Sequence, residues 1–359
     1  MAISRHSTIA HAAYLDLIRS LEDEVVSDIR GTPTRVLRAE RTYWYDTYRV
    51  GSEVMKRYIG EESEELRGRL ERLSEMRGDA DERRRQRSRL IRILRAERFM
   101  SVDPGTGSLL ASMEKAGVFP LGGTIVGTHA FRLYEGELGV TYGFEDTAMT
   151  DDLDIARFER LSLALADTIS PTLQQVLSDF LFEPVPALEP DKVWRWRQTR
   201  SNLLVEFLTP SFEKEEGLRP LAVLGVYAQS LHYLNYLVAE PINAAVPYRS
   251  GVLVRIPRPE RFAIHKLIVA DRRQTGPDSL KSVKDRRQAA FLIQILAENR
   301  PDDLADAYEL AMGNGPNWRK RLEASLSREP EILGDPDRAG QIRSAVISRP
   351  FPAGLHVCC

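Results

Sequence analysis

An acidic pair that alternates with apolar residues, with a glycine turn upstream, strongly limits the folds open to this chain. In Asp152-Leu153-Asp154-Ile155 the polar and apolar residues alternate, which is typical of a β-strand with one face in a core. The two carboxylates would then share a face and repel each other unless a cation lies between them. Mg²⁺ accepts such oxygen ligands readily, so Asp152 and Asp154 are candidate metal ligands.

The upstream turn is Gly122-Gly123-Thr124, which we expect to open a helix over residues 124–134. Backbone N–H groups and the helix dipole at such an N-terminus attract phosphate oxygens. Gly122, Gly123 and Thr124 are therefore candidates for binding nucleotide phosphates. Thr124 could either hydrogen-bond a phosphate or only cap the helix.

A third carboxylate, Glu206, lies inside the apolar run 203–209. This run and residues 193–197 alternate in character and are separated by a polar stretch, which predicts an antiparallel hairpin. A carboxylate in such a strand is costly unless paired, so we expect Glu206 to face a cation or a cavity. Arg195 and Arg197 share one face of the first arm, where they would meet either phosphate or solvent.

With these residues in this order, the chain resembles the nucleotidyltransferase-fold proteins of the DNA polymerase β superfamily. In particular it resembles bacterial members near the AbiEii-type toxins and minimal nucleotidyltransferases. The matching residues are Gly122, Gly123 and Thr124, then Asp152 and Asp154, then Glu206 in Val-Glu-Phe-Leu-Thr-Pro, where the family commonly has Asp. The resemblance continues through residues 259–267 and 281–287 and covers about residues 105 to 300.

This resemblance implies an α+β nucleotidyltransferase fold, in which helices flank a mixed β-sheet. It implies an enzyme that moves an NMP from an NTP to an acceptor hydroxyl with two Mg²⁺ ions held by Asp152, Asp154 and Glu206. Lys266 would neutralise the triphosphate; the alternative from the residues alone is that its ammonium reaches solvent. Asp285 would order Lys266 or an active-site arginine, or form a local ion pair.

The resemblance also bears on partners. The expected acceptor is RNA, in particular the 3′ end of tRNA, with a protein hydroxyl as the alternative. A toxin role would add a neutralising antitoxin protein. Two other classes of protein remain possible from the sequence. One is a non-catalytic nucleotide- or RNA-binding module with the same fold, and the other is a helical interaction protein.

Residues 1–102 are predicted to be helical. Apolar spacing predicts helices over residues 7–30 and 34–59, and the second carries Tyr43, Trp44, Tyr45, Tyr48 and Tyr58. These aromatic residues would pack against a neighbouring helix or a second subunit, giving a homodimer, or would stack on a ligand.

Residues 61–77 and 82–99 are predicted to form a helical hairpin that turns at residues 77–81. Its first arm is rich in Glu and its second carries Arg83, Arg84, Arg85, Arg87, Arg89, Arg92, Arg95 and Arg98. The arginines would form either surface ion pairs or contacts to an RNA backbone.

The predicted domains are an N-terminal helical region over residues 1–102, a nucleotidyltransferase domain over 103–260 and a helical domain over 261–359. Further helices are expected over residues 155–180, from Arg261 and from Lys281. The chain of 359 residues has 50 Lys and Arg against 52 Asp and Glu, so any polyanion-binding surface must be local.

No apolar run is long enough to cross a membrane, which favours a cytoplasmic protein. The cysteines, Cys358 and Cys359, are adjacent and predict no disulfide framework. The six histidines show no metal-ligand spacing, and His129 and His265 are expected to be packed core residues.

Overall fold

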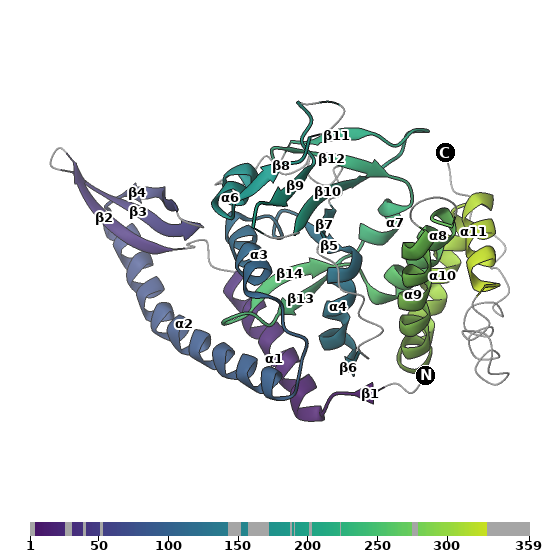
Figure 1. Ribbon diagram of the computed structural model, residues 1–359. Coiled ribbons are helices and arrows are strands. Elements are labelled where there is room, and N and C mark those ends of the chain that lie inside the picture. Colours follow the sequence, from purple (N-terminus) through teal and green to yellow (C-terminus); the bar gives the residue numbers. More distant parts are fainter. Residues whose placement is uncertain are drawn as a thin grey trace, which may run out of the picture. The chain divides into compact units, whose positions relative to one another are not determined.

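The computed structural model describes residues 4–25, 31–38, 41–50, 53–142, 152–156, 172–186, 189, 191–200, 203–222, 224–274 and 279–328. These residues divide into two compact units, the first ending at Ile256 and the second beginning at Pro257. Figure 1 labels the helices and strands of both units. Cys358, Cys359 and residues 157–171 of the helix predicted over 155–180 lie outside the described residues.

A mixed β-sheet is the centre of the first unit. Its strands run in the order β11-β12-β10-β7-β5, and β9 and β8 branch from β10. Strand β10 is parallel to β7 and β12, whereas β5, β9 and β11 are antiparallel to their neighbours. The strands are β5 (Thr124–Val126), β7 (Asp152–Ala156), β8 (Phe182–Pro184), β9 (Arg195–Gln198), β10 (Leu204–Pro210), β11 (Leu218–Leu221) and β12 (Val226–Leu231).

Helices and a hairpin flank this sheet, so the α+β prediction is confirmed. Helix α4 (Gly127–Leu138) packs on β5 and β7, and the hairpin β13 (Ile242–Val246) and β14 (Val252–Ile256) contacts α1 (Thr8–Val25), α3 (Pro104–Ala116) and α4. The remaining short elements are β1 (Ser4–Arg5), β6 (Val140–Thr141), α6 (Leu173–Asp179) and α7 (Leu234–Val238). The expected hairpin around Glu206 is confirmed as β9 and β10.

The helix predicted over residues 34–59 is wrong. This segment forms a three-stranded antiparallel sheet of β2 (Thr32–Arg38), β3 (Arg41–Val50) and β4 (Glu53–Glu61). Aromatic and β-branched side chains fit a pleated sheet better than a helix, where they lose rotamer freedom. The aromatic content that we assigned to a helix face therefore belongs to strands.

The helical hairpin predicted over residues 61–99 is also wrong, because α2 (Glu64–Ala96) is one unbroken helix. A glycine inside a helix, here Gly78, costs about 1 kcal/mol relative to alanine, which a long helix tolerates. The second half of α2 packs on α1 through Ile91, Leu94 and Tyr14. Arg87 is 3 % exposed and donates to the Ser20 carbonyl at 3.2 Å, so this arginine of the basic row is structural.

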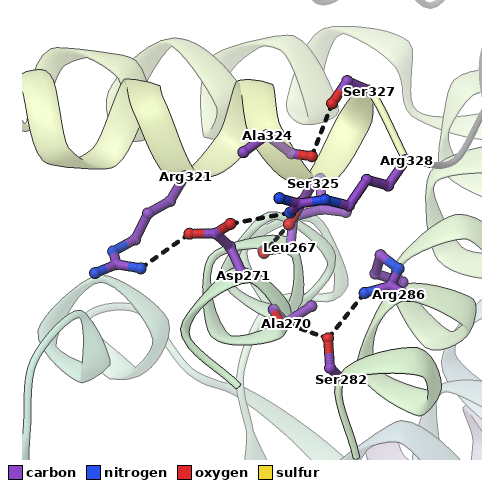
Figure 2. Close-up of polar contacts among 10 residues, drawn as sticks. All are labelled: Leu267, Ala270, Asp271, Ser282, Arg286, Arg321, Ala324, Ser325, Ser327 and Arg328. Carbon is purple, nitrogen blue, oxygen red and sulfur yellow. Dashed lines mark hydrogen bonds and ion pairs between the residues drawn. The ribbon is translucent and has the colours of Figure 1, made fainter. Parts of the chain in front are cut away.

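The described part of the second unit consists of helices α8 (Pro259–Arg272), α9 (Ser279–Asn299), α10 (Pro301–Gly313) and α11 (Pro316–Leu326). The helices predicted from Arg261 and Lys281 are thereby confirmed as α8 and α9. Figure 2 shows how α11 is held on α8, with Asp271 accepting from Arg321 at 2.9 Å and from Arg328 at 3.0 Å. No helix among the described residues of either unit is long and apolar enough to cross a bilayer.

Candidate functional site

The register of three strands brings the predicted acidic positions together. Glu206 on β10 is the backbone partner of Asp154 on the parallel strand β7. On its other side Asp154 pairs with Val126, the last residue of β5. Asp152 pairs with Leu204 at the start of β10. Positions far apart in the sequence, at 126, 154 and 206, therefore lie next to one another in the sheet.

Glu206 has a cationic partner, as the sequence predicted. Its Oε1 atom lies 2.8 Å from Nε of Arg195, which is its register partner on β9. The contact is an ion pair, and the buried Nε of Arg195 makes no hydrogen bond to any described residue. The Arg195 guanidinium also lies 4.3 Å from the Trp194 ring. The Glu206 side chain is 19 % exposed, so this pair is partly shielded from water.

The other face of the same strands is apolar. Trp196 on β9 is buried and its ring meets Phe207 on β10 edge to face, at 5.2 Å between centroids. Residues that alternate along a strand point to opposite faces. Burial of Val205 and Phe207 therefore sets the direction of Glu206 and Arg195, which lie on the opposite face of the sheet.

The glycine turn does not open a helix, so the helix expected to begin at Thr124 is wrong in its start: Gly122, Gly123 and Thr124 lead into strand β5. The N–H groups of Gly122 and Gly123 donate to the carbonyls of Phe119 and Val118, at 2.9 and 2.8 Å. A Cβ at Gly123 would lie 2.7 Å from Val118, so this glycine permits a close chain approach. Thr124 is buried in strand β5. The two glycine amides are thus engaged inside the turn.

A helix N-terminus does occur three residues later than expected, at Gly127. This glycine has a φ of 68°, and α4 begins directly after β5 with no side-chain cap at Val126. The first N–H groups of an α-helix have no partner within the helix and favour anions. Val126 pairs with Asp154, and Gly127 and Thr128 are the next residues along the chain after Val126. The start of α4 therefore lies close to the acidic positions. The sequence signal was the glycine that separates Ile-Val from the amphipathic run of α4.

Lys266 lies in the second unit and is buried beside an acid. Its Nζ donates to Asp285 Oδ1 at 2.5 Å, and Arg273 donates to Asp285 Oδ2 at 2.7 Å. Burial opposes ionisation of Asp285, which is 2 % exposed, but the two cations outweigh it and lower its pKa. Asp285 therefore forms a local ion pair with Lys266, one of the alternatives expected from the sequence, and shares its carboxylate with Arg273.

His265, adjacent to Lys266, is a packed core residue as expected. It is 8 % exposed. Burial first, and then the nearby Lys266 charge, lower the pKa of His265 to about 3. The imidazole is therefore neutral at physiological pH.

Among the side chains that the structure describes, no group of three His, Cys, Asp or Glu residues is arranged to hold a metal ion. The structure describes the backbone of Asp152 and Asp154 in β7. The side chains at positions 152, 154 and 206 all end in carboxylates. Carboxylate oxygens are the ligand type that Mg²⁺ prefers.

Two family models match the chain. One, described as a nucleotidyltransferase, matches residues 105–313, and the other, a domain of unknown function (DUF6788), matches residues 11–68. No curated protein matches the chain, and no solved structure does either. The first match spans the sheet, α4 and the helices that carry Lys266 and Asp285. Because it covers more than half of the 359 residues, the chain belongs to the nucleotidyltransferase family.

Proposed function

We propose that this protein is a Mg²⁺-dependent nucleotidyltransferase that moves an NMP from an NTP to an acceptor hydroxyl. The observation that carries the proposal is the register of β7 and β10, which makes Glu206 the neighbour of Asp154. Register partners in a sheet share a face, so the three acidic positions are suited to one cation site. The proposal includes the assignment of the fold to the DNA polymerase β superfamily.

Asp152, Asp154 and Glu206 are the proposed metal ligands, for two Mg²⁺ ions. When bound, magnesium stabilises negative charge on the attacking and leaving oxygens of a phosphoryl displacement. Arg195 holds the Glu206 carboxylate in one orientation through the 2.8 Å ion pair. Glu206 then accepts the proton of the acceptor hydroxyl as it attacks.

The nucleotide phosphates are assigned to the first turn of α4, at Gly127 and Thr128. The amides of Gly122 and Gly123 are engaged in their own turn, so these glycines support β5 and α4 and do not contact phosphate themselves. Lys266 is proposed to stabilise the pyrophosphate that leaves. The group of Lys266, Arg273 and Asp285 carries one net positive charge, which suits an anion better than a neutral ion pair would.

The proposed acceptor is RNA, with the 3′ end of tRNA as the first candidate. A protein hydroxyl is the alternative acceptor. The toxin role with an antitoxin partner is proposed from the sequence resemblance to AbiEii-type toxins alone, and expression of the chain with and without its neighbouring gene tests that role.

The central experiment incubates the full chain with each labelled NTP, Mg²⁺ and either total RNA or a protein lysate. We expect label to enter the RNA fraction, and Asp152→Ala with Asp154→Ala to abolish it without lowering the melting temperature. Glu183→Ala on β8 is the matched control, because Glu183 is an exposed acid on the same sheet. Full activity of the Asp152/Asp154 variant would refute the assignment.

The same samples separate the two rival classes. A non-catalytic module would bind nucleotide without releasing pyrophosphate. A helical interaction protein would show no rise in melting temperature when Mg²⁺ and nucleotide are added together, whereas a ligand that binds the folded state raises it.

A further inference from the structure

The sheet β2–β3–β4 carries three tyrosines on one face. The register pairs Tyr45 with Tyr58, and Tyr43 lies two residues before Tyr45 on β3. The Tyr58 ring lies 5.7 Å from the Tyr45 ring and 6.3 Å from the Tyr43 ring, between centroids. We call this the tyrosine face; it also includes Thr34, Thr47, Arg41, Arg49 and Lys56.

The opposite face of this sheet is turned toward α2. A Cβ at Gly60 would lie 3.1 Å from the Leu66 side chain, and Glu62 pairs with Arg35 at 3.1 Å and with Arg67 at 2.6 Å. Figure 1 shows the sheet beside the first half of α2. These contacts orient the sheet, and they leave the tyrosine face directed away from the helix.

The tyrosine face is more exposed than a packing role alone requires. Cross-strand aromatic pairs stabilise small sheets, and part of the role of these rings is structural. Tyr58, however, is 54 % exposed, whereas aromatic rings that only pack are mostly covered. The face therefore presents ring surface to the solvent.

Cations share this face with the rings. Among the side chains of the face that the structure describes, Arg41, Arg49 and Lys56 are exposed cations, and Glu61 is an acid, 3.6 Å from Arg41. Cations interleaved with aromatic rings match a strand of phosphates with unpaired bases, since bases stack on the rings and phosphates pair with the cations. A paired duplex hides its bases and would not use the rings.

We propose that the tyrosine face binds single-stranded RNA, which it would deliver as the acceptor of the transfer reaction. The choice of RNA over DNA rests on the proposed function, whereas the preference for a single strand rests on the exposed rings and cations of this face. A protein partner is the competing occupant, because Tyr and Arg are also common in protein–protein interfaces; the binding test below separates the two.

The test is binding of a short fluorescent single-stranded RNA to the full chain, followed by fluorescence anisotropy without NTP or Mg²⁺. We expect Tyr45→Ala and Tyr58→Ala each to weaken binding about 5- to 100-fold, as for other base-stacking rings. Tyr58→Phe keeps the ring and should bind like the unmodified chain. Lys56→Ala should lower the slope of log affinity against log salt by about one.

Leu37→Ala is the matched control, because Leu37 is 72 % exposed and lies on the opposite face of β2. A single-stranded DNA and an RNA duplex of the same sequence complete the series, and both should bind more weakly than the single-stranded RNA. Equal binding of the DNA would overturn the assignment to RNA.

Unchanged RNA affinity in Tyr45→Ala and Tyr58→Ala would overturn the proposal. If Arg84→Ala with Arg89→Ala then removed binding, the RNA site would lie on α2 instead. Absence of RNA binding together with a changed sedimentation coefficient in Tyr58→Ala would assign the face to a protein contact. The Asp152→Ala variant should keep RNA affinity while losing transfer, so failure of the proposed chemistry and failure of this surface give different results.

Discussion

Glu206 on β10 forms an ion pair of 2.8 Å with Arg195, its register partner on β9. On the other side of β10, the register partner of Glu206 is Asp154 on β7. The pair joins the acidic positions to the antiparallel hairpin. It gives the sheet a way to keep a carboxylate charged on a face that is partly shielded from water, because a nearby cation offsets the loss of hydration.

Replacing Arg195 with Ala should reduce both stability and transfer. The free energy of unfolding should fall by about 1 to 2 kcal/mol, less than for a fully buried pair, because Arg195 is 36 % exposed. Loss of the group that orients a metal ligand should lower transfer about tenfold or more. Urea unfolding and label incorporation measure the two effects.

The control for that variant is Arg197→Ala, an exposed arginine two residues along the same strand. It should change stability by no more than about 0.5 kcal/mol. If Arg195→Ala behaved like Arg197→Ala in both assays, the ion pair would have no role in positioning Glu206.

The two glycine positions should respond differently to alanine. Gly123→Ala should lower stability by about 1 to 3 kcal/mol, because its Cβ would lie 2.7 Å from Val118, while the KM for nucleotide stays near its original value. Gly127→Ala, at a φ of 68°, should raise the KM for nucleotide as the start of α4 shifts. Thermal unfolding and nucleotide titrations measure both.

Gly217→Ala is the control for both glycine variants, since a Cβ there would meet no atom within 4 Å. If Gly123→Ala raised the KM for nucleotide strongly without loss of stability, the phosphates would bind at the glycine turn and not at the start of α4.

His265 should make the second unit sensitive to acid. The pKa of His265 is about 3 in the folded chain, against about 6.5 when unfolded. The unfolded chain therefore binds more protons between these values, and stability falls as the pH drops from about 6.5 toward 3. By pH 5 the loss from this group should reach about 2 kcal/mol.

The measurement compares urea unfolding at pH 7 and pH 5 for the natural chain and for His265→Gln. The variant should lose less stability over this interval. The comparison removes the opposite contribution of Glu260, whose pKa is raised mainly by burial and which therefore favours the folded state at lower pH. An identical loss in both chains would show that His265 is accessible to protons when folded.

Two aspartates of the second unit should differ in importance. Asp285→Asn leaves Lys266 and Arg273 without their shared anion at a site 2 % exposed, and should cost about 3 to 5 kcal/mol. Asp271→Asn removes ion pairs to Arg321 and Arg328 at a side chain 16 % exposed (Figure 2), and should cost about 1 kcal/mol. Chemical denaturation ranks them, and a reversed order would contradict the burial argument.

The sequence was sufficient where a single strand or helix carries its own signature. The hairpin of β9 and β10 and the helices α8 and α9 have regular periodicity over their length and clear breaks, and all were predicted. The family was also predicted, because the order of Asp152, Asp154 and Glu206 along the chain is a property of the sequence and is consistent with the match over residues 105–313.

The sequence misled where two periodicities compete within a short window. Apolar spacing predicted a helix over residues 34–59, yet residues 32–61 pair as strands. The contact between Tyr45 and Tyr58 that supports this sheet exists only after the chain has turned back on itself. Gly78 suggested a break that α2 does not have, since its local cost is small against the rest of a long helix.

The sequence by itself determined which residue types are present for chemistry, namely three carboxylates, a lysine with its aspartate, and a glycine before a helix. Only the tertiary structure decided their partners: Glu206 with Arg195, and Val126 and Glu206 on either side of Asp154. The physical reason is that strand register is set by pairing between distant segments and by burial of one sheet face, and neither quantity is contained in a local stretch of sequence.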